Sequence, residues 1–432
     1  MKRKLLFILI FIIAFGFNLF IKEVSFDEVW IYGFSYNISK GLIPYLDFNM
    51  LQTPFSLFVG SIFIKIFGNY LFSLCILNGL IVTLSIYFLY RIIGYRSLLL
   101  FPLFVMYTIF GYNTFCLFFL ILILYFVYMD KEKDFVMGLI IGICFITKQT
   151  IGICLLVPYL FYSKNRLKSL FSFMIPFLIL SIYLVYNNCF YQFMDYCFFG
   201  LLDFGNKNSN VGILFFVSCM VVLSLFIILI KGKFKDRGLF YILAFQIMAF
   251  PLGDFYHFMM AFLPVLFYII YRVKYKYIII FIGILSYNIF IISFVRSVSN
   301  FYLVMDNNYL FLKRMDRVSY SNIVSKSKII DEERNDCYFI ISPESYYIKL
   351  YLGIDIGKYD FMLNGNMGYH GSEKMIKDIS EEVVDKRCLF YVSKGIIFEN
   401  NNQFSREVYD YVRSYPQLSV GNGYFDIYSN IR

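Results

Sequence analysis

Two adjacent carboxylates, Asp27 and Glu28, follow the first strongly apolar run of the chain, residues 5–21. A positioned carboxylate can act as a general base that takes a proton from a hydroxyl group. It accepts a proton more readily when apolar neighbours or a second carboxylate disfavour its ionised form. The pair therefore predicts acid–base chemistry close to the end of this apolar run.

The sequence also offers a structural role for part of this pair. Ser25 and Glu28 have the spacing of a capping box, and Gly41 is a typical helix end. Between them, apolar residues recur at helical intervals: Phe26, Val29, Trp30, Phe34 and Ile38. Asp27 lies off this stripe, although a carboxylate in the first turn also suits the helix dipole. We expect an amphipathic helix at the outer interface, in which Glu28 is a cap and Asp27 faces a substrate cavity.

Polar side chains that suit an anionic substrate stand at the ends of later apolar runs. Lys148 ends the run 135–147 without an acidic neighbour in sequence. Asp254 and His257 share a helix face where the run 257–271 begins. Lysine binds phosphate groups, and histidine can donate to a sugar or a phosphate. The structural alternatives are a lysine that snorkels to the membrane surface and an aspartate that caps its helix.

Composition determines the class of protein. The 432 residues are 60% hydrophobic and 22% aromatic, and only 16% are charged, which excludes a soluble globule and predicts a polytopic membrane protein. A spanning helix needs about 20 apolar residues, and shorter ones occur inside bundles. About eleven runs fit this description: 5–21, 71–90, 97–110, 113–129, 135–147, 151–163, 169–187, 211–230, 238–252, 257–271 and 277–295.

Lysine and arginine cluster before the first run and in every second connection after it, as they do in cytoplasmic loops. This distribution places the N-terminus inside and the tail outside. No small-residue cleavage site follows the first run, so we expect a retained membrane anchor. The predicted fold is an all-α polytopic membrane bundle over residues 1–296, with a long first outer loop with amphipathic helices at 22–70 and an extracytoplasmic α/β domain at 297–432.

The net charge of +10 divides unevenly along the chain. Residues 297–432 contain 16 Lys and Arg against 18 Asp and Glu, a net −2, so residues 1–296 carry +12. The positive charge therefore follows from membrane topology and suits anionic lipid headgroups. No nucleic-acid partner is predicted.

Nine cysteines are scattered without a C-x-x-C motif or a neighbouring histidine, so zinc and thiol redox sites are not supported. Cys189 with Cys197, or Cys337 with Cys388, could pair outside the cell. We expect free, buried thiols instead.

Short β-rich runs alternate with helical stretches in the tail and predict a small α/β domain with a parallel or mixed sheet. The β-rich runs are 337–341, 359–363, 389–392 and 424–428, and the helical stretches are 344–352, 372–384 and 403–414. The segment Gly365 to Gly368 is expected to form a turn, and His370 to be an ordinary surface residue.

An ordered set of short motifs lies between the first two apolar runs: Asp27-Glu28, a Tyr-rich helix, Gly41 to Tyr45, Asp47-Phe48, Thr53-Pro54 and Ile66 to Gly68. This order resembles the first outer loop of the polytopic GT-C glycosyltransferases, which include protein mannosyltransferases and aminoarabinose transferases. The segment Phe145 to Gln149 is similar to their Leu-Thr-Lys-Gly segment, with Gln149 in place of glycine. The resemblance covers roughly residues 1–300.

The resemblance implies a cell-membrane transferase that takes a sugar from a polyprenyl-phosphate carrier at the outer face. The acceptor would be a glycan, a lipid or a protein, and the transfer would usually invert the sugar. Asp27 would be the catalytic base. The implied substrate-binding residues are Glu28, Lys148, Gln149, Asp254, His257 and Asn113.

One departure from the family concerns metal. Members often carry a second acidic residue between the third and fourth spans, where this chain has Asn113. An asparagine cannot act as a base, so no metal ligands are predicted and a divalent metal stays an open alternative. Asp47, Asp195 or Asp203 could supply the missing carboxylate.

Two other classes also fit about eleven spans. One is a transporter, flippase or polymerase of lipid-linked glycans, and the other is a non-catalytic envelope scaffold. Ion-coupled transport usually places ionisable residues within the spans, near the membrane midplane. Here the carboxylates lie mainly in the connections and the tail, which favours the transferase.

Overall fold

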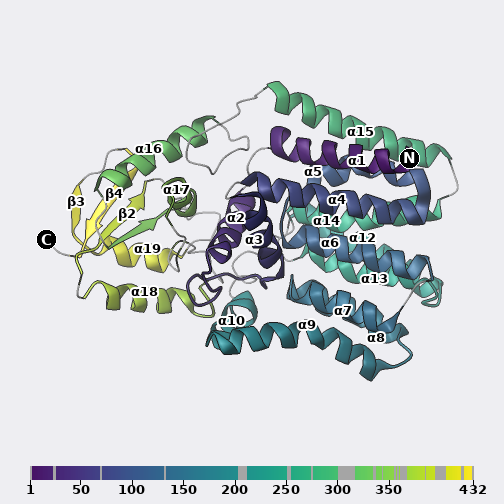
Figure 1. Cartoon of the computed structure of the whole chain (residues 1–432), viewed down its shortest axis with the longest axis horizontal. Coiled ribbons are helices and arrows are strands. Elements are labelled where there is room, and N and C mark those ends of the chain that lie inside the picture. Colours follow the sequence, from purple (N-terminus) through teal and green to yellow (C-terminus); the bar gives the residue numbers. More distant parts are fainter. Residues whose placement is uncertain are drawn as a thin grey trace.

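A computed structural model gives the structure of the chain. Figure 1 shows a helical bundle, a tail with a small sheet, and two short helices, α2 and α3, between them. The structure describes residues 2–22, 26–68, 71–130, 133–202, 212–250, 254–273, 276–299, 317–333, 337–342, 344–354, 357, 360, 367–384, 386–394, 405–419 and 423–430.

Each predicted apolar run coincides with helical structure, as expected for segments whose backbone groups must be hydrogen-bonded internally. The bundle contains α1 (Lys2–Gly16) with the π-helical η1 (Phe17–Ile21), α4 (Leu71–Ile93), η2 (Gly94–Leu99), α5 (Phe101–Tyr107), α6 (Tyr112–Tyr128), α7 (Asp134–Phe145), α8 (Gln149–Tyr162), α9 (Arg166–Tyr186), α10 (Phe190–Met194), the π-helical η3 (Asp195–Phe199), α12 (Ile213–Lys231), α13 (Arg237–Phe245), η4 (Gln246–Ala249), α14 (Phe255–Arg272) and α15 (Lys276–Ser299).

Five of the described helical segments are long and apolar enough to cross a membrane. They are Lys4–Ile21, Leu71–Leu99, Arg166–Tyr186, Ile213–Lys231 and Phe255–Arg272. Ile182 on α9 and Ile213 on α12 are 70% and 79% exposed, as lipid contact requires. The chain is therefore a membrane protein, and the eleven-span count and the inside location of the N-terminus stay predictions.

The run 97–110 differs most from a regular span. Gly94 has a φ of 63° and begins a 3-10 segment, and α5 after it has only seven residues. Pro102 lies in the first turn of α5, where its missing N–H costs no helical hydrogen bond. Beyond α5, the Thr108 carbonyl accepts hydrogen bonds from Lys22 and Asn78. The chain thus returns to the level where α1 ends and α4 begins.

The connection between the first two apolar runs contributes α2 (Phe26–Ser39) and α3 (Phe55–Phe67). The structure differs here from an amphipathic helix on a surface, because α2 is buried on all sides. Val29, Ile31, Tyr32 and Phe34 are all at most 4% exposed, and the polar Ser35 is fully buried. The physical reason is that α2 packs against α3 and against the tail helix α17 (Ser345–Tyr351).

The tail forms an α/β unit around a mixed four-stranded sheet of order β1-β2-β4-β3. β1 and β2 are parallel, and β4 is antiparallel to both β2 and β3. Sequence reasoning missed the short β3, and its strand at 359–363 lies almost entirely outside the described residues. The elements are α16 (Arg317–Glu333), β1 (Tyr338–Ile341), α17, α18 (Gly371–Glu382), β2 (Leu389–Ser393), α19 (Arg406–Arg413), β3 (Gln417–Ser419) and β4 (Phe425–Ser429).

A disulfide joins Cys337 to Cys388, which corrects the expectation of free thiols for this pair. The physical reason is the register of the parallel strands, in which Tyr338 lies opposite Leu389. The residues just before them are therefore neighbours, with Cα atoms 4.6 Å apart. Cys189 and Cys197 are free and buried, as expected.

The tail contacts the bundle at two places. Tyr346 and Tyr347 of α17 are 1% and 7% exposed and belong to the same hydrophobic core as the bundle helices. On the other side, Lys374 of α18 forms an ion pair with Asp195 in the connection after α9. The tail is therefore docked above α2 and beside η3.

Candidate active site

Four side chains from the starts of three helices, α6, α8 and α14, form a continuous hydrogen-bonded row. Lys148 Nζ donates to Asn113 Oδ1 at 2.9 Å. Asn113 Nδ2 lies 3.2 Å from His257 Nε2, and His257 Nδ1 lies 2.7 Å from Asp254 Oδ2. The structure thus brings together four of the residues that the sequence singled out in three different apolar runs.

The order of donors in this row determines which ring nitrogen of His257 carries the proton. A lysine ammonium can only donate, so Asn113 must turn its carbonyl oxygen to Lys148 and its NH2 group to His257. His257 Nε2 is then the acceptor, and the ring proton sits on Nδ1, where it donates to Asp254. The bonding partners alone therefore determine this tautomer. The imidazole in this row is neutral.

Local structure holds each member of the row. Asp254 is the N-cap of α14, and its Oδ1 accepts the His257 backbone N–H at 2.8 Å. Burial alone would raise the pKa of Asp254, but the hydrogen bonds from His257 bring it below its usual value. Lys148 precedes α8 in extended conformation. Close by, a Cβ on Gly152 would lie 2.3 Å from the Cα of Phe145, so α7 and α8 meet where only glycine fits.

Lys148 is a half-buried cation with neutral partners. Besides Asn113, its Nζ lies 3.5 Å from Met248 Sδ and 5.1 Å from the centroid of the Tyr112 ring. Within the described ranges, no carboxylate oxygen lies within the 4.0 Å limit for an ion pair with Nζ. A partly desolvated ammonium without a counter-ion is suited to an anionic ligand.

Asp27 lies in the first turn of α2, close enough to the row to share its electrostatics. Burial raises the pKa of the Asp27 carboxyl, and Asp254 and Glu28 raise it further, whereas positive charge on His257 and Lys148 opposes the shift. The Asp27 side chain is partly exposed, yet burial by the surrounding protein has the largest effect on its pKa. Because His257 is neutral, one of these opposing charges is absent, and the pKa of Asp27 stays raised.

No side chain among the described residues donates a hydrogen bond to the Asp27 carboxylate. The carboxylate oxygens can therefore accept a hydrogen bond from a ligand. A carboxylate with a raised pKa and a vacant acceptor position has the properties of a general base.

Two predicted substrate contacts point elsewhere. The Gln149 amide donates to the Cys197 carbonyl on η3, because the first residue of α8 faces η3 rather than the row. Glu28 is 4% exposed and borders an apolar recess. The recess is otherwise lined by Leu71, Leu74, Cys75 and Phe110. Ser25, the partner of Glu28 in the predicted capping box, lies outside the described residues.

The other carboxylates considered from the sequence do not join the row. Asp47 accepts the Ile43 N–H at 2.6 Å within the outer loop, and Asp195 is bound to the tail. Asp203 lies outside the described residues. His370 is exposed, in agreement with the prediction.

Sequence reasoning missed four residues around the site: Tyr112, Met248, Tyr346 and Tyr347. The first two contact Lys148. Tyr346 and Tyr347 lie near Asp27, whose charge helps to raise the pKa of both phenols after the larger effect of burial. The available signal was a pair of adjacent tyrosines in an otherwise polar tail.

A divalent metal has no ligand set in the part of the chain that the structure describes. There, no three His, Cys, Asp or Glu side chains cluster in a way that could hold an ion. Asp254 and His257 are already bonded to each other. The described residues therefore do not form a metal site.

Comparison with known proteins gives a match in structure only. No family model matches the sequence, and no curated protein does. The fold matches the crystal structure of ArnT from Cupriavidus metallidurans bound to undecaprenyl phosphate, with a TM-score of 0.59 and 11% identity. It also matches ArnT in the apo state, with a TM-score of 0.61 and 10% identity. Each match covers 100% of this chain and 98% of the other. ArnT is a GT-C aminoarabinose transferase, so this chain has a GT-C-like fold.

Proposed function

We propose that the protein is a membrane glycosyltransferase that moves a sugar from a polyprenyl-phosphate carrier to an acceptor of the cell envelope. The carrying observation is the pairing of Lys148, a cation with neutral partners, with Asp27, a carboxylate with a raised pKa, at one end of the bundle. The solved neighbour is bound to undecaprenyl phosphate, which supports a lipid phosphate as the ligand class. The acceptor class is a glycan, a lipid or a protein.

In this proposal, Lys148 holds the phosphate of the donor. The bond between the sugar and the phosphate breaks during transfer, and the phosphate leaves with additional negative charge. A preorganised ammonium stabilises that charge more in the transition state than in the ground state. Asn113 keeps Nζ in place without neutralising it.

Asp27 is the proposed base that takes the acceptor hydroxyl proton. The acceptor oxygen then forms the new bond at the anomeric carbon as the phosphate departs, which inverts the sugar. A positioned base contributes typically 10²- to 10⁴-fold to the rate. In the neutral His257, Nδ1 already carries a proton and the Nε2 lone pair accepts from Asn113, which supports Asp27 rather than the imidazole for this role.

We place the site and the tail at the extracytoplasmic face. The disulfide between Cys337 and Cys388 supports this location, because disulfides persist in oxidising compartments. The alternation of basic connections along the chain supports it as well. Alkaline phosphatase fused after residue 430 should be active, and activity of a cytoplasmic reporter at that position would contradict the assignment.

The function is tested by transfer in proteoliposomes supplied with polyprenyl-phosphate sugars. The wild type should transfer sugar, and Asp27→Asn should reduce the rate about 10²- to 10⁴-fold while the protein stays folded. The matched control is Asp47→Asn, which removes the same charge from an exposed position of the same loop. Full activity of Asp27→Asn would remove Asp27 as the base. Movement of the lipid across the bilayer without transfer would favour a flippase.

A further inference from the structure

We propose that Asp195 is a positioning residue through which the docked tail holds Lys148 in its place. The inference rests on the proposed function, which assigns Lys148 to the donor phosphate. Asp195 begins η3, a π-helical turn in the outer connection between α9 and α12. Its side chain is only 8% exposed. Single π-helical turns are often found at functional sites.

The first link joins Asp195 to the tail. Its Oδ2 accepts from Lys374 Nζ at 2.5 Å, and its Oδ1 accepts the Tyr369 backbone N–H at 3.1 Å. A Cβ on Gly368, which has a φ of 84°, would lie 2.3 Å from Oδ2. Both carboxylate oxygens of Asp195 therefore accept hydrogen bonds from the tail. The approach is so close that position 368 must be glycine.

The second link joins η3 to the segment that carries Lys148. Two residues after Asp195, the Cys197 carbonyl accepts the hydrogen bond from the Gln149 side chain. Cys197 Sγ also lies 3.4 Å from Tyr45 Oη, which donates to the Gln52 carbonyl at 2.7 Å. The same short turn thus contacts the tail, the first outer loop and the start of α8.

The last link is covalent, because Gln149 follows Lys148 directly. Lys148 reaches Asn113 only while the start of α8 stays fixed. Removal of the ion pair leaves a buried carboxylate without its cation, which favours displacement of η3. Gln149 then loses its acceptor, and Lys148 loses its fixed orientation. Undocking of the tail should therefore weaken donor binding more than it slows the chemical step.

The experiment uses the full chain in nanodiscs and reverses the charges of the pair. The variants are Lys374→Asp, Asp195→Asn, and the double variant Asp195→Lys with Lys374→Asp. The control is Lys377→Asp, on the same helix, where Lys377 is 75% exposed and pairs with Glu381 one turn away. Hydrogen exchange is measured over residues 193–199 and 145–152, and kcat and KM are measured with a polyprenyl-phosphate sugar.

Lys374→Asp should increase exchange in both segments and raise the donor KM about tenfold at nearly unchanged kcat, a typical size for coupling between sites. Asp195→Asn, which keeps an acceptor for Tyr369, should show the same pattern more weakly. The double variant should restore protection and KM only in part, because it renews the ion pair but a lysine cannot accept the Tyr369 N–H. The control should change neither. Faster exchange at 193–199 with unchanged exchange at 145–152 would overturn the proposal.

The two proposals fail in different ways. If both segments respond and the double variant partly restores their protection while neither the wild type nor any variant transfers sugar, then the link from the tail to Lys148 stands and the transferase function fails. If the wild type transfers sugar and the reversed pair leaves KM unchanged, then the function stands and Asp195 is not a positioning residue.

Discussion

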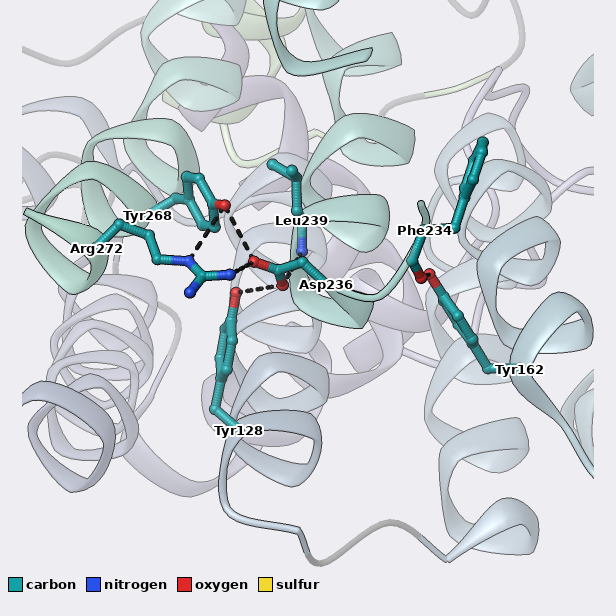
Figure 2. Close-up of polar contacts among 7 residues, drawn as sticks. All are labelled: Tyr128, Tyr162, Phe234, Asp236, Leu239, Tyr268 and Arg272. Carbon is teal, nitrogen blue, oxygen red and sulfur yellow. Dashed lines mark hydrogen bonds and ion pairs between the residues drawn. The ribbon is translucent and has the colours of Figure 1, made fainter. Parts of the chain in front are cut away.

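The two ends of α14 carry polar networks of opposite character. Near its C-terminal end, Asp236 is surrounded by donors (Figure 2). Its Oδ1 accepts the Leu239 N–H at 3.1 Å and the Tyr128 hydroxyl at 3.3 Å. Its Oδ2 accepts from the Tyr268 hydroxyl at 3.0 Å and pairs with Arg272. Every charge in this network has an opposite charge beside it.

In the network at the start of α14, neither Lys148 nor Asp27 forms a direct ion pair with a described side chain. Lys148 has neutral partners, and Asp27 receives no side-chain hydrogen bond from the residues that the structure describes. The two networks lie towards opposite ends of this 18-residue helix, which is about 27 Å long. A saturated network stabilises the fold, whereas one with vacant positions is prepared for a ligand.

The largest expected effect comes from Lys148→Met, which keeps the length of the side chain and removes its charge. Loss of a charged partner from a phosphate typically costs 2–5 kcal/mol, so the affinity for undecaprenyl phosphate should fall at least about 30-fold. Titration of the purified protein with this lipid measures the change. Arg272→Met removes a cation from the other network and should leave the affinity unchanged. Equal losses in both variants would contradict the comparison.

A smaller effect, on stability rather than on donor affinity, is expected for Asp236→Ala. It leaves Arg272, Tyr128 and Tyr268 without their shared acceptor and removes the N-cap of α13. An unsatisfied buried group costs roughly 1–3 kcal/mol, so the thermal unfolding midpoint in detergent should fall. Donor affinity of the folded fraction should stay at the wild-type level. Asp236→Asn keeps the cap acceptor and should lose less stability.

Much of the architecture could be predicted from the sequence, because apolar length and basic connections are local signals. They placed Lys148, Asn113 and Asp254 at helix ends on one side of the membrane, and the structure brings these side chains together. Three of the four strands of the tail sheet, β1, β2 and β4, coincide with predicted β-rich runs. The resemblance to the GT-C class is confirmed at the level of the fold.

The remaining features depend on contacts between distant parts of the chain. Tyr346 reaches the neighbourhood of Asp27 only because the tail folds back onto α2. The disulfide requires the register of two parallel strands, which cysteine spacing does not reveal. Gln149 faces η3 because of the rotation of α8 about its axis, and periodicity over a uniformly apolar helix does not fix that rotation.

The finest test of the comparison is the pH dependence of Asp27→Asn. The pKa of Asp27 is raised in the folded protein, chiefly by burial. At a pH below the ordinary pKa of an aspartate carboxyl, about 3.9, Asp27 is protonated in both the folded and the unfolded state. The carboxyl group then makes no pH-dependent contribution to stability. Between this ordinary pKa and the raised pKa, only the folded state holds the proton, so wild-type stability falls as pH rises.

Asp27→Asn lacks this loss because an amide does not ionise. Its unfolding midpoint should therefore exceed that of the wild type at neutral pH, and the difference should shrink as the pH falls towards 4. Transfer by the wild type should rise with pH through the raised pKa, since only the ionised carboxylate can take a proton. Thermal melts at several pH values measure the first effect, and initial rates measure the second. If Asp27→Asn were less stable than the wild type at neutral pH, Asp27 would be a residue that stabilises the fold, as Asp236 is.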